Sequence, residues 1–138
     1  MAITSGVTNQ FKLDCLNGVH QPGDTYKCAL YTDSASLDAA TTAYTATNEV
    51  SGTGYTAGGA TLSGRAASLD GSVAMLDFTD PSWTSATITA RGCMIYNASK
   101  SNAAIAVYDF GGNASITGGT FTVNFPSAAA ATALVRIE

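Results

Sequence analysis

A chain of 138 residues has room for one domain, and a domain of this size buries roughly two-thirds of the surface that its unfolded form exposes. Its 6 basic and 10 acidic residues leave a net charge of −4, and the scattered basic residues do not form the cationic cluster that nucleic-acid binding needs. No apolar run approaches the roughly 18 to 20 residues of a membrane span, and no secretory signal pattern is present. We therefore expect no nucleic-acid or membrane partner, and assembly in the cytosol.

The first nine residues are uncharged and mostly small. We expect residues 1–9 to form a flexible N-terminal arm that orders against neighbouring subunits, with Ile3 and Val7 as its contacts. The remaining residues, 10–138, are expected to form a single domain.

Alternating apolar and polar residues predict two strands early in this domain. Phe11, Leu13 and Cys15 alternate with polar residues, and residues 26–31 alternate in a similar way. Because turn residues fill the stretch 17–24 between them, the two strands are predicted to form a hairpin with an extended loop.

A long loop rich in Gly, Ser and Thr follows at residues 33–65, where large apolar side chains are scarce. So long an irregular segment in a compact domain is usually functional or ordered by a partner. Only residues 36–45 have room for a helical turn or two. Four glycines miss the spacing of a phosphate-binding loop and are interpreted as tight-turn residues: Gly52, Gly54, Gly58 and Gly59.

The second half of the chain contains the clearest strand pattern, in which Phe121, Val123 and Phe125 share one face. Further strands are predicted at residues 73–79, 86–96, 104–110 and 133–137. Seven or so strands without a long helical period predict an all-β fold, a single-domain antiparallel β-sandwich of jelly-roll or immunoglobulin-like type.

Groups able to carry out chemistry are few. His20 is the only histidine and is expected on a surface loop, without a second histidine to share a metal. Asp77, Asp80 and Asp109 are expected to cap turns at strand ends, although a small hydrolase using Asp77 and Asp109 is the rival from the enzyme class. We therefore predict no catalytic residue, cofactor or metal site. The three cysteines are expected to be free and buried in strands: Cys15, Cys28 and Cys93.

Trp83 opens a predicted strand segment after a turn and is expected to anchor the core or a subunit interface. The alternative is a sugar-stacking platform that Trp83 forms with Tyr44, Tyr55, Tyr96 and Tyr108.

Four segments, Asn48–Gly59, Trp83–Gly92, Ile95–Asn97 and Val107–Gly111, together resemble a family of small virion proteins of tailed bacteriophages. Its members are capsid decoration (cement) proteins or other structural proteins of the particle. The resemblance implies a protein on the outside of the virion that binds the major capsid protein lattice as a homodimer or homotrimer. It implies no catalytic residue.

On this interpretation the arm and the glycine-rich loop make contacts with capsid or with neighbouring subunits, because many modest contacts on a lattice add to a high overall affinity. The predicted interface residues are Ile3, Val7, Val50, Gly52, Gly54, Tyr55, Gly58, Gly59 and Trp83. The alternative is a tail or fibre component that binds a host glycan through Trp83 and exposed tyrosines.

Overall fold

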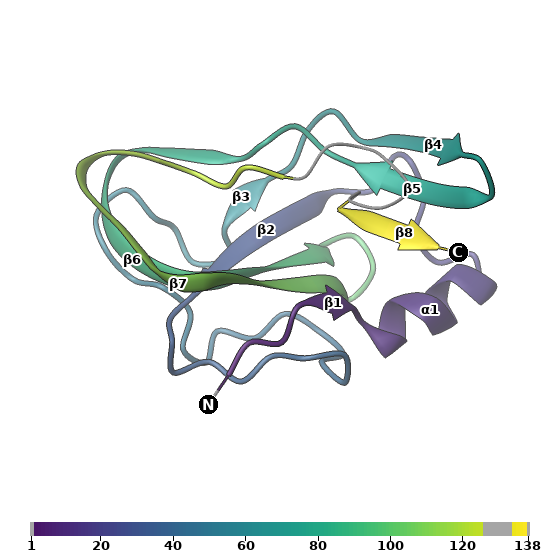
Figure 1. Ribbon diagram of the computed structural model, residues 1–138, viewed down its shortest axis with the longest axis horizontal. Coiled ribbons are helices and arrows are strands. Elements are labelled where there is room, and N and C mark those ends of the chain that lie inside the picture. Colours follow the sequence, from purple (N-terminus) through teal and green to yellow (C-terminus); the bar gives the residue numbers. More distant parts are fainter. Residues whose placement is uncertain (1, 126–133, 138) are drawn as a thin grey trace.

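The computed structural model describes residues 2–125 and 134–137. These residues form two antiparallel sheets of five and three strands and one short helix (Figure 1). The predicted antiparallel β-rich fold is confirmed at this level, apart from the helix.

Each sheet is assembled from strands that are distant in the sequence. The larger sheet has the order β1-β7-β6-β2-β3 and contains β1 (Gly6–Val7), β7 (Ala103–Thr122), β6 (Ser82–Asn97), β2 (Tyr26–Tyr31) and β3 (Ala60–Thr61). The smaller sheet has the order β4-β5-β8 and contains β4 (Ala66–Asp70), β5 (Val73–Asp77) and β8 (Val135–Ile137).

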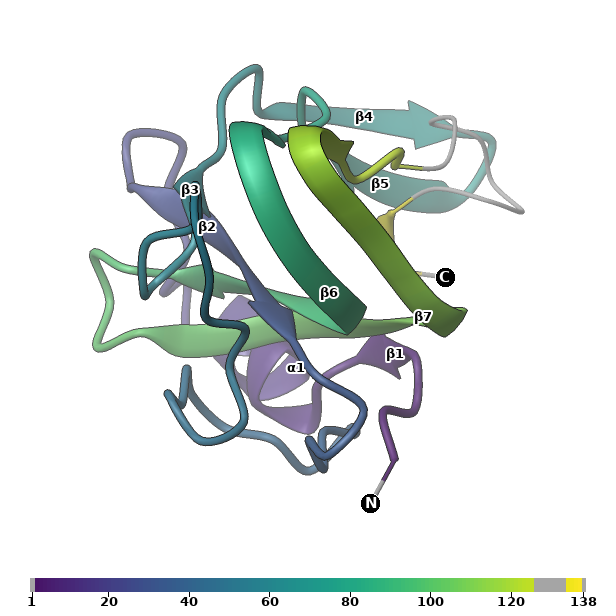
Figure 2. The same ribbon diagram turned by 90° about the vertical axis from the view of Figure 1, so that its left-hand side faces the viewer.

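The β6–β7 hairpin forms the centre of the larger sheet and curves strongly along its length (Figure 2). The segments 104–110 and 120–125, predicted as separate strands, belong to one strand up to Thr122, which continues through the glycines between them. Gly111 has a φ of 86°, which side-chain-bearing residues rarely adopt, and the register between the two strands shifts at four places. Such irregularities bend a strand without ending it.

The predicted strand over Phe11–Cys15 is wrong, because these residues lie in helix α1 (Asn9–Leu16). Thr8 caps the helix: its hydroxyl oxygen accepts a hydrogen bond from the Phe11 amide at 3.0 Å. Phe11 is buried, whereas Leu13 is 53% exposed, so the apparent alternation does not define a buried face. The predicted hairpin with residues 26–31 is therefore absent, although β2 itself is confirmed.

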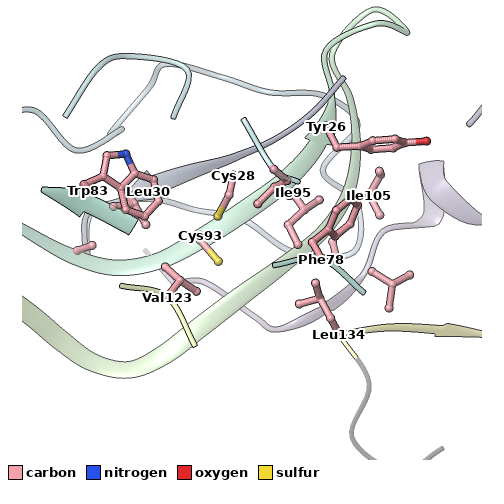
Figure 3. Packing of buried hydrophobic residues seen from close by; sticks show 14 of the residues in the cluster. Tyr26, Cys28, Leu30, Phe78, Trp83, Cys93, Ile95, Ile105, Val123 and Leu134 are labelled. Carbon is pink, nitrogen blue, oxygen red and sulfur yellow. The ribbon is translucent and has the colours of Figure 1, made fainter. Parts of the chain in front are cut away.

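The larger sheet has a hydrophobic cluster on each face where it is widest. Cys28 and Leu30 of β2 lie in the main cluster (Figure 3). This cluster also holds residues of the smaller sheet such as Leu76. Ala29 and Tyr31 point to a second cluster on the other face. A strand buried on both faces has few polar positions, and β2 fits that rule.

The second cluster is covered by the segment 35–44, where the predicted helical turns are not found. Instead Leu37 forms a parallel bridge with Ile3, and Ala43 forms an antiparallel bridge with Ala103. Leu37 is buried under this cover. These contacts with the sheet require an extended backbone, and they outweigh the weak helix propensity of this stretch.

Candidate protein-interaction surfaces

The glycine-rich loop, predicted to contact other proteins, packs closely on its own domain. A Cβ added at Gly59 would lie 1.9 Å from the carbonyl oxygen of Cys28, and one at Gly52 would lie 2.5 Å from that of Thr87. Gly54 approaches the backbone of Ala86 in the same way. These glycines allow the loop backbone to lie against β2 and β6, so their first role is in the monomer.

Tyr55 ties this loop to the sheet through Glu49. Its hydroxyl donates to Glu49 Oε2 at 2.5 Å and accepts from the Leu30 amide at 3.0 Å. Glu49 also accepts from the Tyr44 hydroxyl at 2.6 Å and from the Gly58 amide at 2.8 Å. Burial raises the pKa of Tyr55, and the Glu49 carboxylate raises it further. Tyr55 is thus an internal support of the loop.

The other predicted interface residues are also largely occupied within the domain. Trp83 is 6% exposed and lies in the main cluster (Figure 3). Its ring packs with Tyr55 and Phe121, at ring-centroid distances of 5.9 and 6.2 Å. Val50 and Ile3 are buried. The expected core role of Trp83 is therefore confirmed, and its ring does not form an exposed sugar platform.

The predicted N-terminal arm lies along the larger sheet. Gly6 and Val7 pair with Val107 and Ala106 of β7, and the Thr8 hydroxyl donates to the carbonyl oxygen of Ala104 at 2.8 Å. Val7 is half-buried and packs against the main cluster. The mobility of this segment stays a prediction.

His20 is not on the surface as predicted: its side chain is 7% exposed, and its ring stacks on Phe11. Asn97 Nδ2 lies 3.0 Å from His20 Nδ1, and because an amide nitrogen can only donate, Nδ1 is the acceptor. The ring proton is then on Nε2, 3.3 Å from Oδ2 of Asp14. Burial lowers the pKa of His20. With Nδ1 bound to Asn97 and Nε2 facing a carboxylate, the ring has no nitrogen directed at a nucleophile.

The three aspartates considered for chemistry have structural partners. Asp109 Oδ1 accepts from Arg91 Nε at 2.7 Å, and this guanidinium lowers the pKa of the carboxyl group. Asp77 accepts from the Phe78 amide and Asp80 from the Phe125 amide, each at 2.9 Å. Asp77 and Asp109 lie in different sheets.

The cysteines divide into two kinds. Cys28 and Cys93 are buried in neighbouring strands and are free, as predicted (Figure 3). Cys15 is exposed, contrary to the prediction, because α1 replaces the expected strand. Among the residues described by the structure, no group of three or more His, Cys, Asp or Glu side chains is placed to hold a metal ion.

The outer half of the β6–β7 hairpin presents a long uncharged surface. No charged residue occurs between Asp80 and Arg91 or between Asp109 and Arg136. Alternate residues along both strands are exposed, and most of them carry hydroxyl groups: Thr84, Thr87, Thr89, Ser115 and Thr117. We call the exposed side of Ser82–Ala90 and Phe110–Thr122 the hydroxyl face.

The hydroxyl face ends at an open strand edge. In the described part of the chain, β7 pairs on this side only with β1, through Ala106 and Val107. Beyond Tyr108, β7 pairs with β6 on one side, and no strand among the described residues pairs with its other side. An exposed strand edge can pair with a strand of another protein. The edge strand β4 of the smaller sheet is a second such place, with all five residues exposed and Leu69 exposed by 72%.

A groove of about 770 Å³ lies between α1, β1 and β8. Its apolar lining includes Val7, Phe11, Leu16 and Ile137, and the charged residues among its described lining are Lys12 and Arg136. Sequence reasoning missed both the groove and the hydroxyl face. The groove depends on α1, which was predicted as a strand, but the charge-free run after Asp109 was a readable signal for the face.

Comparison of the chain with protein-family models, curated proteins and solved structures gives no match. No helix in residues 2–125 or 134–137 has the length and apolar character needed to cross a lipid bilayer. The function must therefore be inferred from the residues and their geometry.

Proposed function

We propose that this protein is a structural component of a tailed-bacteriophage particle that binds the outer surface of the major capsid protein lattice and stabilises the head. The proposal rests first on the hydroxyl face and its open edge, an uncharged surface of two long strands. Surface charges oppose close contact because they must lose water on binding, whereas hydroxyl and methyl groups lose less. The resemblance of the sequence to small virion proteins supports the same proposal.

The proposed contact is pairing of a capsid strand or loop with the edge of β7, together with packing on the exposed threonines. Backbone hydrogen bonds along a strand edge supply affinity, and alternate side chains supply specificity. A homodimer or homotrimer engaging several capsid subunits at once strengthens binding by raising the effective concentration. We also propose that the two sheets form the layers of a β-sandwich, because Leu76 and Val135 of the smaller sheet share a core with Cys28 and Ile95 of the larger one.

The two alternative functions, a glycan-binding tail component and a hydrolase, depend on residues that have other contacts in the structure. A glycan-binding tail component was to use Trp83, which is buried between Tyr55 and Phe121. A hydrolase was to use Asp77 and Asp109, which are bound to the Phe78 amide and to Arg91. We therefore propose a non-catalytic role.

The first test is the copy number of the protein relative to the major capsid protein in purified virions, measured by quantitative mass spectrometry. We expect a ratio near unity. A few copies per particle would place the protein in the tail or connector, and absence from the particle would contradict the proposal.

A further inference from the structure

His20 lies at the junction of three parts of the fold. Its ring stacks on Phe11 of α1, lies 6.4 Å from the ring of Tyr26 in β2, and contacts Asn97 at the end of β6. The residue itself belongs to the stretch 17–24, which joins α1 to β2. A buried titratable ring therefore connects this stretch to the tip of the β6–β7 hairpin.

Asn97 is held in one orientation by two other hydrogen bonds. Its Oδ1 accepts from the Ser99 amide at 3.0 Å, and its Nδ2 donates to Asp24 Oδ2 at 2.8 Å. Exchanging the two ends of this amide group would set its nitrogen against an N–H group and its oxygen against a carboxylate. Nδ2 therefore also donates to His20 Nδ1, and this ring nitrogen must stay unprotonated to accept.

A proton on Nδ1 has no acceptor in this arrangement. It would face the N–H of Asn97, and rotating the amide group to receive it would break the hydrogen bonds to Ser99 and Asp24. On the other side of the ring, Nε2 already faces Asp14 Oδ2 in the neutral form. The ring can take up the proton without these losses by moving away from Asn97 into water.

The groups around His20 do not remove this conflict. The charged and titratable residues near its ring come from α1, β2, the hairpin tip and the neighbouring loops: Asp14, Asp24, Lys100, Tyr26 and, behind the Tyr26 ring, Arg65. Burial has the largest effect and lowers the pKa of His20, whereas Asp14 raises it. Asp24 and Lys100 form an ion pair with each other at 2.8 Å, so their effects on the ring partly cancel.

We propose that His20 is an acid-operated latch: the neutral ring fastens residues 18–21 to Asn97, and protonation opens this segment within the folded domain and uncovers the ring of Phe11. Residues 24 and 25 stay attached to the hairpin tip through the Asp24–Lys100 ion pair and through the Thr25 amide, which donates to Ser99 Oγ at 2.8 Å. The hydrogen bonds from Lys100 lower the pKa of Asp24, so this carboxylate remains charged at pH 5. The latch does not depend on the proposed function.

The test is an NMR measurement on the full chain, with the His20 ring nitrogens and the Val19 backbone amide as probes. The Val19 amide donates to the Asp14 carbonyl oxygen at 3.0 Å, so its hydrogen exchange reports opening of the segment. If only the open form takes up a proton, at the ordinary pKa of 6.5, the open population rises by at most about 25-fold between pH 7 and pH 5. After correction for the intrinsic pH dependence of exchange, we expect Val19 to exchange about five- to 25-fold faster at pH 5.

Low concentrations of urea distinguish this local opening from unfolding of the whole domain. Exchange through a local opening depends little on urea because little surface is exposed, whereas exchange through global unfolding follows the full urea dependence of stability. We expect the exchange of Val19 at pH 5 to depend little on urea. Exchange with the urea dependence of global unfolding would overturn the proposal, and so would exchange that does not become faster on acidification.

The ring signals and one variant identify the trigger. At pH 7 the nitrogen chemical shifts of His20 should be those of a neutral ring with its proton on Nε2, and a proton on Nδ1 would overturn the latch. His20→Gln should abolish the faster exchange of Val19 at pH 5, and an effect that persists would assign it to another group. If this variant does not fold, the wild type decides: the latch requires the ring titration and the change in Val19 exchange to share one midpoint, and different midpoints would overturn it.

Discussion

Tyr55 and Glu49 share a hydrogen bond of 2.5 Å, and the same tyrosine oxygen accepts the backbone amide of Leu30. One side chain therefore joins the glycine-rich loop to the central strand β2. The loop that the sequence presents as free is held in place by this contact and by glycines that lie against the sheet.

Replacing Tyr55 with Phe removes the hydroxyl group and leaves the Leu30 amide without its acceptor. We expect the free energy of unfolding to fall by about 1 to 3 kcal/mol, the range for an unsatisfied buried polar group. Tyr44→Phe is the comparison variant, because that hydroxyl also donates to Glu49 but is not the acceptor of the Leu30 amide of β2. Urea unfolding followed by tryptophan fluorescence measures both, and equal losses would contradict the special role of Tyr55.

Gly59→Ala tests the close approach of the loop to β2. The new methyl group would meet the Cys28 carbonyl, and the φ of 82° is unfavourable for alanine, so we expect a loss of about 2 to 5 kcal/mol. Gly111 has a similar φ of 86°, and no atom of the described residues lies within 4 Å of an added Cβ. Gly111→Ala should therefore show the backbone effect alone, about 1 to 2 kcal/mol. The difference between their urea midpoints measures the contact, and no difference would mean that the loop is not packed on β2.

His20 makes stability depend on pH between about 7 and 5. Burial lowers its pKa from the ordinary 6.5, so in this window the unfolded chain binds more protons than the folded one. The free energy of unfolding should therefore fall as the pH falls. His20 is the only histidine, so His20→Gln should flatten this dependence while changing the stability at pH 7 for its own reasons. The urea midpoints of the wild type and of His20→Gln are compared at pH 7 and pH 5. A wild-type midpoint that does not fall at pH 5 would count against a buried neutral His20.

Thr117→Lys places a charge on the hydroxyl face beside the open edge of β7. We expect capsid binding to weaken at least about tenfold with little change in stability, because a charge at an edge strand opposes pairing with another strand. Thr25→Lys is the matched control, since Thr25 is exposed and lies next to the turn end of the hairpin. Co-sedimentation with capsids compares the two variants, and equal binding would remove the hydroxyl face from the proposed function.

The sequence predicts β2, β5 and β6 because the apolar residues of each strand follow the pattern of its buried positions. It fails for α1, because Phe11, Leu13 and Cys15 fit a strand pattern equally well. Only the capping by Thr8, together with the contact of its hydroxyl to Ala104 of β7, decides between the two structures. That contact joins residues 96 positions apart, which a local pattern cannot reveal.

The candidate site shows the same limit. Gly52, Gly54 and Gly59 were correctly interpreted as backbone-shaping residues, but their partner is the protein's own sheet, and sequence alone does not distinguish an internal partner from an external one. The absence of charged residues from β7 beyond Asp109 was visible in the sequence. The position of this part of β7 at a sheet edge depends on the strand order, which the sequence did not reveal.

The contact between Thr8 and Ala104 also sets an order of events during synthesis. The residues of β1 and α1 leave the ribosome before β7, because the strand on which they dock is made about a hundred residues later, a delay of roughly 5 to 20 s at about 5 to 20 residues per second. Until then the N-terminal segment has no β7 to pair with, and Phe11 has no complete core to enter. The strand β1 and the helix α1 are therefore among the last parts of the domain to reach their final places.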